Sequence, residues 1–213
     1  MSLLSKFGMA AGVNVNYFTP KLDGLNDKLT KAGLPEFSKG IFTYGGSGYV
    51  YVLFVRNLRF GGIGFGGSQT VTDGNKSAKL TLSGGGITVE YTLPQVRSFA
   101  LSFGAIIGGG KLSLDLYDKT SSMNWDDVWN EYEGDAEAKH IDISSSYFLF
   151  APTVNAEFLL SRLIAFRVGI GYQFAIAENW EVYNEQNLNN VPSNFSGNGF
   201  FANVGILIGL FVF

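Results

Sequence analysis

The single histidine of the chain begins a short row of polar residues of the types that hydrolysis needs. His140, Asp142, Ser144 and Ser146 alternate along HIDISSS, so they share one face of a predicted strand. Side chains two residues apart on a strand lie about 6.5–7 Å apart, whereas a nucleophile and its base need about 2.6–3.2 Å. We therefore interpret the row as the polar end of a strand that leads into a loop, with a lipid hydrolase as the alternative.

Three glycine-rich runs, at 61–67, 84–86 and 108–110, also have the composition of phosphate-binding loops. No Gly-Lys-Ser or Gly-Lys-Thr sequence follows them and no predicted helix starts there, which excludes that function. We interpret the glycines as β-bulges and as small residues in a narrow interior; the alternative is space for a thin apolar ligand such as an acyl chain.

Composition excludes several other kinds of chemistry. The chain has no cysteine, so it has neither disulfides nor thiolate metal sites. Its net charge of −3 is too small to indicate a nucleic-acid partner. We predict no catalytic residue, no metal and no cofactor.

The residues above belong to long segments with very few charges. Charged residues make up 15% of the chain, against about 25% in soluble domains. No apolar run reaches the roughly 18 residues of a membrane helix. Short turns and long polar loops alternate between the segments, and Leu22, Leu25 and Leu29 predict a short helix over 21–32. The eight predicted strands cover 7–18, 40–56, 59–72, 77–93, 97–116, 140–160, 163–177 and 199–213.

The seventh predicted strand shows its two faces most clearly. From Ile164 to Ile176 every second residue is large and apolar, and the residues between are small or polar. Strands that face lipid must close into a barrel to pair their backbone groups. We therefore predict an all-β single domain over 1–213: an eight-stranded antiparallel up-and-down transmembrane β-barrel with short helices in the long loops. Three strands are apolar on both faces, so we do not assign which face is inward: 40–56, 59–72 and 199–213.

The alternation slips by one residue at two of the glycine runs. In 77–93 and 97–116 the apolar phase changes across 84–86 and 108–110, so we predict a bulge at each run. Pro152 is predicted to mark another.

The phase of the strands predicts which charges face the lumen. Glu157 and Arg167 lie at similar distances from the turn at 161–162, so we predict a structural ion pair between them, with a proton or ion path as the alternative. Eight strands leave an interior that side chains fill, so no open pore is expected. The charges predicted to point inward are Lys79, Glu90, Lys111, Asp115, Asp142, Glu157 and Arg167.

The loop at 117–139 carries two tryptophans on a predicted helix. Trp125 and Trp129 are four residues apart, with acidic residues around them. We interpret them as part of a cap on the barrel mouth; the alternatives are a loop recognition surface and a weak cation site.

The chain ends on alternating apolar residues and an aromatic one, GILIGLFVF. Together with the strand pattern over the whole chain, this end resembles the small eight-stranded outer-membrane barrels of Gram-negative bacteria, with Leu207, Phe211 and Phe213 matching their C-terminal assembly signal. The resemblance implies an outer-membrane location, with outer-membrane lipid and the barrel-assembly machinery as partners. Lys6 interrupts the opening MSLLSKFGMAAG, so a signal peptide is expected to lie outside this numbering.

These observations favour an outer-membrane barrel that is not an enzyme and has a structural, loop-display or partner-docking role without an open pore. A protein partner or a homo-oligomer fits that role. The alternatives are a lipid-binding or lipid-modifying barrel and a soluble barrel of lipocalin type. The charge-free windows at 41–55, 60–72, 98–110 and 198–213 argue against the soluble class.

We expect deletion of Phe213 to reduce insertion into the outer membrane of cells while refolding into detergent stays nearly intact. The physical reason is that one terminal side chain contributes little to the fold but belongs to the predicted assembly signal. Insertion is measured by fractionation of cells. Equal insertion with and without Phe213 would contradict the assignment.

Overall fold

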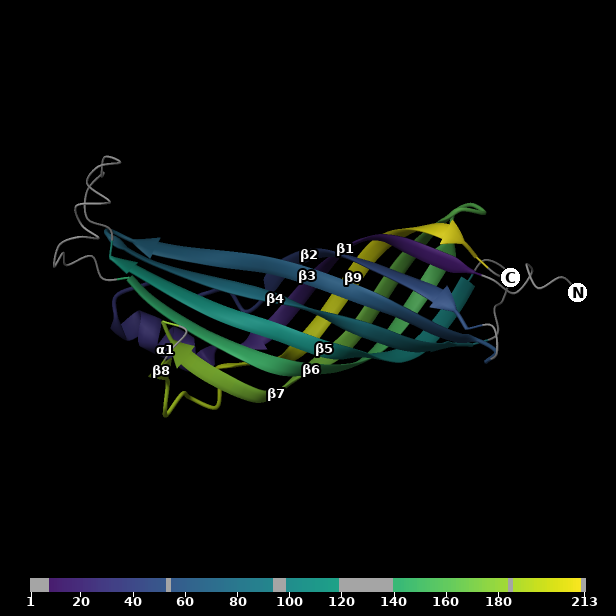
Figure 1. Cartoon of the computed structure of the whole chain (residues 1–213). Helices are drawn as coiled ribbons and strands as arrows, with labels where there is room; N and C mark the ends of the chain where they lie inside the picture. The colour runs from purple at the N-terminus through teal and green to yellow at the C-terminus, as the bar shows by residue number, and fades with distance from the viewer. Residues whose placement is uncertain (1–7, 53–54, 94–98, 119–139, 184–185, 212–213) are drawn as a thin grey trace, which may run out of the picture.

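Antiparallel ladders join every neighbouring pair of long strands in a computed structural model that describes residues 8–52, 55–93, 99–118, 140–183 and 186–211. The strand order is β6-β5-β4-β3-β2-β1-β9-β7, and pairing of β6 with β7 closes the sheet (Figure 1). The elements are β1 (Met9–Lys21), α1 (Asp23–Lys31), β2 (Ile41–Tyr51), β3 (Leu58–Asp73), β4 (Lys76–Thr92), β5 (Phe99–Asp118), β6 (His140–Leu159), β7 (Ile164–Val182), β8 (Gln186–Asn187) and β9 (Ser196–Leu210).

The predicted closed eight-stranded antiparallel barrel is confirmed. Met9 at the start of β1 pairs with Leu210 at the end of β9. The first and last strands therefore begin and finish at the same end of the barrel, which we call the turn end. The opposite end, where β3 reaches Asp73, is the loop end. The two-residue β8 is an addition to β7 at the loop end. Among the described residues, no helix has the length and apolar character needed to cross a membrane.

The bulges predicted at the glycine runs are wrong. β4 pairs with β5 in one unbroken register that includes Ser83 with Lys111 and Gly85 with Gly109. No register shift occurs at Pro152 either. The irregularities of the described strands lie elsewhere, near Lys21 and at residues 146–148 of β6.

What changes at the glycine runs is the environment of the two faces. Toward the turn end, outward residues are apolar, as with Ile87 and Phe103, and we call this part the apolar belt. Toward the loop end, outward residues are polar, as with Ser83, while inward Leu82 and Leu112 are buried. A strand that leaves lipid for water must exchange its polar and apolar faces, and it does so here without changing phase.

This exchange overturns part of the lumen assignment. Lys79, Lys111, Asp115 and Asp142 were predicted to point inward, but they alternate with buried Leu80, Leu112 and Leu114 and therefore point outward. Their strands at this level have an apolar interior and a watery exterior. Of the seven charges predicted to point inward, the three within the apolar belt, Glu90, Glu157 and Arg167, do face the lumen.

The loop-end part of the barrel has a hydrophobic core of its own. Leu25 and Leu29 of α1, within the helix predicted over 21–32, pack into the mouth together with Phe37. They join the inward leucines of β4 and β5 and the Trp180 side chain of β7 in one buried cluster. The helix is amphipathic, so it caps the mouth with its apolar face and keeps its lysines in water.

We expect Phe103→Lys to destabilise the protein in a bilayer by roughly 2–4 kcal/mol, because it places a charge on the lipid face of the belt. Thr81→Lys, on the outward face of the loop-end part, is the matched control and should cost almost nothing. Urea unfolding in lipid vesicles measures both. Equal costs would show that the belt is not the part of the barrel that lies in lipid.

Candidate functional site

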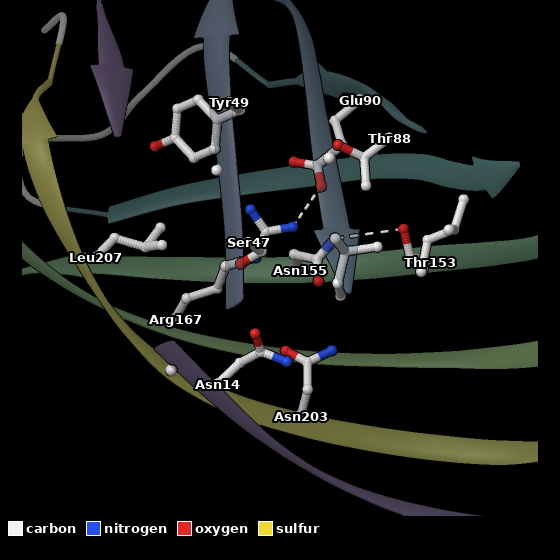
Figure 2. Close-up of a pocket in the computed structure, with 15 residues that line it drawn as sticks. Asn14, Ser47, Tyr49, Thr88, Glu90, Thr153, Asn155, Arg167, Asn203 and Leu207 are labelled. Carbon is white, nitrogen blue, oxygen red and sulfur yellow. Dashed lines mark hydrogen bonds and ion pairs between the residues drawn. The ribbon is translucent and has the colours of Figure 1, made fainter. Parts of the chain in front are cut away.

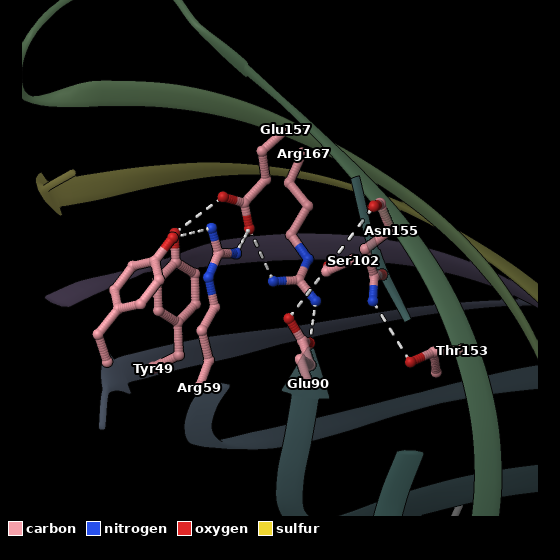
Figure 3. Close-up of polar contacts among 9 residues, drawn as sticks. Tyr49, Arg59, Glu90, Ser102, Thr153, Asn155, Glu157 and Arg167 are labelled. Atoms are coloured by element: carbon pink, nitrogen blue, oxygen red, sulfur yellow. Dashed lines mark hydrogen bonds and ion pairs between the residues drawn. The ribbon is translucent and has the colours of Figure 1, made fainter. Parts of the chain in front are cut away.

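Four charged side chains from four strands meet inside the apolar belt (Figure 3). The side chains of Arg59 and Glu157 are 1% and 3% exposed, and Glu90 and Arg167 are also largely buried. Two positive and two negative charges leave the group neutral. Its members are Arg59 on β3, Glu90 on β4, Glu157 on β6 and Arg167 on β7.

Glu157 is the centre of this network. Its Oε1 accepts hydrogen bonds from Arg59 at 2.7 Å and from Arg167 at 3.0 Å. Its Oε2 accepts one from the Tyr49 hydroxyl at 2.8 Å. Arg167 also bonds Glu90, whose other oxygen lies 3.4 Å from the Ser102 hydroxyl. Each charge therefore has an opposite partner, which burial in a narrow lumen requires.

Strand register brings these residues together. Glu157 lies directly opposite Arg167, and Arg59 directly opposite Glu90. Gly104 faces Glu90 from β5, and a Cβ there would come within 2.8 Å of the Glu90 Cγ atom. The missing side chain leaves room for the carboxylate in the narrow interior.

Two tyrosines complete the surroundings of Arg59. Its guanidinium carbon lies 4.2 Å from the ring centre of Tyr49 and 4.7 Å from that of Tyr51. A desolvated guanidinium over aromatic rings gains cation–π stabilisation. The guanidinium also donates to the Tyr51 hydroxyl.

The sequence analysis paired two members of this network, placed a third in the lumen and missed the others. Glu157 and Arg167 were predicted as a pair, and the structure places them in contact. Glu90 was expected in the lumen without a partner. Arg59 and Tyr49 were missed because their strands are apolar or glycine-rich on both faces. The sequence pattern therefore did not show which residues of these strands point into the lumen.

Two small voids lie in the described part of the lumen beside the network. One of about 30 Å³ is lined by Asn14, Thr88, Asn155 and Arg167 among others (Figure 2). Asn14 lines this void, and its Oδ1 atom has no hydrogen-bond partner among the described residues. A space of this size holds one or two water molecules. A second void, of about 20 Å³, lies beside Phe18 and Phe65.

The polar row that begins at His140 lies on the outward face of the loop-end part. The Nε2 atom of His140 is 3.4 Å from Asp115 on β5, and its ring stacks on Tyr117 with centroids 4.6 Å apart. Desolvation and the nearby carboxylates of Asp115 and Asp142 raise the pKa of Tyr117. Within the described ranges, no group of three or more potential ligands is placed to hold a metal ion.

The remaining predicted sites are only partly described. Trp125, Trp129 and Phe213 lie outside the described residues. Leu207 is 1% exposed and points into the barrel, where Phe211 packs against the same cluster. The outward residues of β9 at this end are Ile206, Ile208 and Leu210. The role of the C-terminal motif in assembly stays a prediction.

The closed barrel, its apolar belt and its neutral polar lumen define a class of fold, that of the small eight-stranded outer-membrane barrels. No family model matches the chain, and no curated protein matches its sequence.

Comparison with solved structures supports this class. The major outer membrane protein of Thermus thermophilus superposes with a TM-score of 0.54 at 8% identity, over 96% of this chain and 99% of that one. Ail, the attachment invasion locus protein of Yersinia pestis, in complex with the heparin analogue sucrose octasulfate, gives 0.51 at 9% identity over 96% and 97%. Neisserial surface protein A gives 0.50 at 11% identity over 96% of each chain. At such low identity the likeness shows the fold alone.

We expect Arg167→Met to destabilise the protein by roughly 3–5 kcal/mol, because Glu90 loses its only arginine and Glu157 one of two. Arg167→Met combined with Glu90→Gln should cost much less, since the Arg59–Glu157 pair stays intact and neutral. Urea unfolding of detergent-refolded protein measures both. Asp115→Asn, on the outward face, is the control with little expected effect.

A double variant as unstable as the single one would contradict the network. It would mean that Glu90 gains nothing from Arg167, or that another group neutralises it.

Proposed function

We propose that the protein is a non-enzymatic outer-membrane barrel with a closed lumen, and that it works through its loop-end surface as a docking protein. The observation that carries this proposal is the exchange of faces at the glycine runs 84–86 and 108–110. Beyond them the strands continue into water as a sheet with its own apolar core. A barrel that only needed to span lipid would not require this part.

Two different fillings support a closed lumen. In the apolar belt, the Arg59–Glu157 pair and its neighbours occupy the interior. Toward the loop end, buried Leu80, Leu82 and Leu112 occupy it, and α1 covers the mouth. Voids of about 30 and 20 Å³ are too small for solute passage. If one of these two sets of side chains were removed, the other would still close the lumen.

The geometry at His140 supports a role without catalysis. The imidazole lies on an open outward surface and is paired with a carboxylate and an aromatic ring. Hydrolytic sites hold the base in a pocket that also holds the substrate. His140 is 50% exposed on the outward face, whereas the cavity beside it is lined by the inward residues Ile141 and Ile143.

A specific observation favours lipid binding as the second candidate function. A cavity of about 480 Å³ lies between α1, the loop-end parts of β5 and β6, and residues 188–195. Leu25, Leu114 and Ile143 are among its mostly apolar lining residues, and Lys28 and Lys76 are among its polar ones. Size and composition match those of ligand sites. Binding of a fatty acid that is lost in Leu114→Trp would support this candidate.

The docking proposal predicts that Thr81→Cys is labelled by a membrane-impermeant maleimide on intact cells, whereas Phe103→Cys is not. Thr81 faces outward beyond the belt and Phe103 faces outward within it. The chain contains no cysteine, so each variant carries a single thiol. Labelling is measured before and after lysis, and failure of Thr81→Cys to react on cells would overturn the surface location.

The same proposal requires that the protein conducts no ions in planar bilayers. Arg167→Met with Glu90→Gln should also stay closed, because the apolar filling toward the loop end is unchanged. Steady conductance of the native protein would contradict the closed lumen.

A further inference from the structure

The barrel wall extends farther at the loop end on one side than on the other. β3, β4, β5 and β6 reach beyond the ends of β1 and β2 (Figure 1). The helix α1, which follows β1, lies inside this extension, where Leu25 and Leu29 belong to the buried cluster of the wall. The cavity of about 480 Å³ between α1, β5, β6 and residues 188–195 lies here, and we call it the mouth cavity.

Specific contacts hold the two parts of the cavity wall that do not belong to the barrel. Asn26 fixes α1, because its Nδ2 donates to the Phe37 carbonyl at 3.2 Å and its Oδ1 accepts from the Phe37 N–H at 3.0 Å. The segment after β8 is attached to β7, where the Leu188 N–H donates to the Trp180 carbonyl at 2.8 Å. The ring of Phe195 lies 4.5 Å from that of Trp180. The cavity is therefore preformed, as ligand sites usually are.

The interior of the mouth cavity is apolar although it lies on the watery side of the belt. Leu116, Ile143, Leu188 and Val191 line it and are only partly buried, and Ile141 is 36% exposed. Apolar surface that is rimmed by polar residues marks a binding site. Water fills apolar cavities poorly, so a ligand that covers these side chains is stabilised by the apolar area that it buries.

Two lysines stand at the rim of the mouth cavity. Lys28 of α1 and Lys76 of β4 are exposed lining residues, and neither forms an ion pair with a described carboxylate. The Lys76 Nζ donates to the Ala32 carbonyl at 3.2 Å, which leaves two of its three donors for a ligand. Asp118 also lines the cavity, opposite Lys76 in the β4–β5 ladder. Two positive charges and one negative charge leave the described lining at +1, which favours an anion.

We propose that the mouth cavity binds an amphiphile with one acyl chain and an anionic headgroup. The acyl chain lies among Leu25, Leu114 and Ile143, and the headgroup lies at the rim between Lys28 and Lys76. The proposal rests on the second candidate function, lipid binding, and names the class of ligand.

The place of the cavity favours a ligand with one chain. The cavity lies on the inner side of the wall and beyond the belt, so its ligand arrives through water and not from the bilayer. A molecule with a single acyl chain leaves a membrane readily, whereas two chains anchor it stably. The volume of about 480 Å³ also falls in the lower half of the range of about 300–1,000 Å³ for ligand sites.

Photolabelling of the protein in lipid nanodiscs tests the proposal. The probe is palmitic acid with a diazirine at the end of its chain, and mass spectrometry identifies the labelled peptides. At about pH 9 the carboxylate is ionised and lysine keeps its proton. Labels on residues 188–195 report the mouth cavity, and labels near Phe103 report probe dissolved in the bilayer. Cavity labelling should saturate, and the alcohol with the same chain should bind there at least about threefold more weakly.

Variants of the protein separate the headgroup site from the chain site. Lys28→Gln and Lys76→Gln should weaken cavity labelling by the acid but not by the alcohol. Lys79→Gln, on the outward face of β4, is the matched control and should have no effect. Val191→Trp fills the cavity from the loop side and Leu114→Trp fills it from the barrel side. Each should remove cavity labelling and leave belt labelling unchanged.

Three outcomes overturn the proposal. The first is equal cavity labelling by acid and alcohol with no effect of the lysine variants, in which case lipid binding survives without the anionic headgroup. The second is no label on 188–195 from either probe, which removes the lipid-binding candidate as well. The third is cavity labelling only after Trp125→Ser and Trp129→Ser, which would assign the cavity to a segment of this chain. None of them depends on Thr81→Cys labelling, which tests the docking function separately.

Discussion

The structure depends on the requirement that every backbone polar group surrounded by lipid finds a partner. Strands meet it only when the sheet closes on itself. Closure with eight strands fixes a narrow interior. That interior determines the rest of the belt: small residues such as Gly104 line it, and any charge in it needs an opposite charge within reach. Arg59, Glu90, Glu157 and Arg167 satisfy this condition together, as a neutral group that spans four strands.

The same requirement explains where the sequence pattern was sufficient. The segment 163–177 lies in lipid over its whole length, so its large apolar residues stay on one face. Their alternation therefore predicted the outward face of β7 correctly. Counting from the turn at 161–162 placed Glu157 and Arg167 close together, because antiparallel register is set locally by a short turn. Fold class, strand number and this pair were accessible from local patterns alone.

The failures occur where the surroundings change within one strand. A one-residue slip of the apolar phase has two physical causes, a bulge that turns the strand and a boundary that exchanges lipid for water. The sequence of 84–86 does not distinguish them, because glycine suits both. The structure shows that the strands keep their phase while the surroundings change, so Lys79 and Asp115 point into water. Arg59 was missed for a related reason. Its strand has no face that is clearly more polar than the other, so the sequence does not show which residues point inward.

The boundary at the glycine runs separates two tasks within one set of strands. Inside the belt, closure and charge pairing are fixed by lipid and leave little freedom for variation. Beyond it, water can pair the backbone, so a strand no longer needs a neighbour on both sides. The ladder between β2 and β3 ends at Gly66 while β3 continues to Asp73 beside β4. The end of β7 is covered by β8 and by the side chains of Glu178 and Asn198. Among the described strands, a ladder that lipid would not allow to end does so on the watery side of Gly85 and Gly109, where water can pair the backbone.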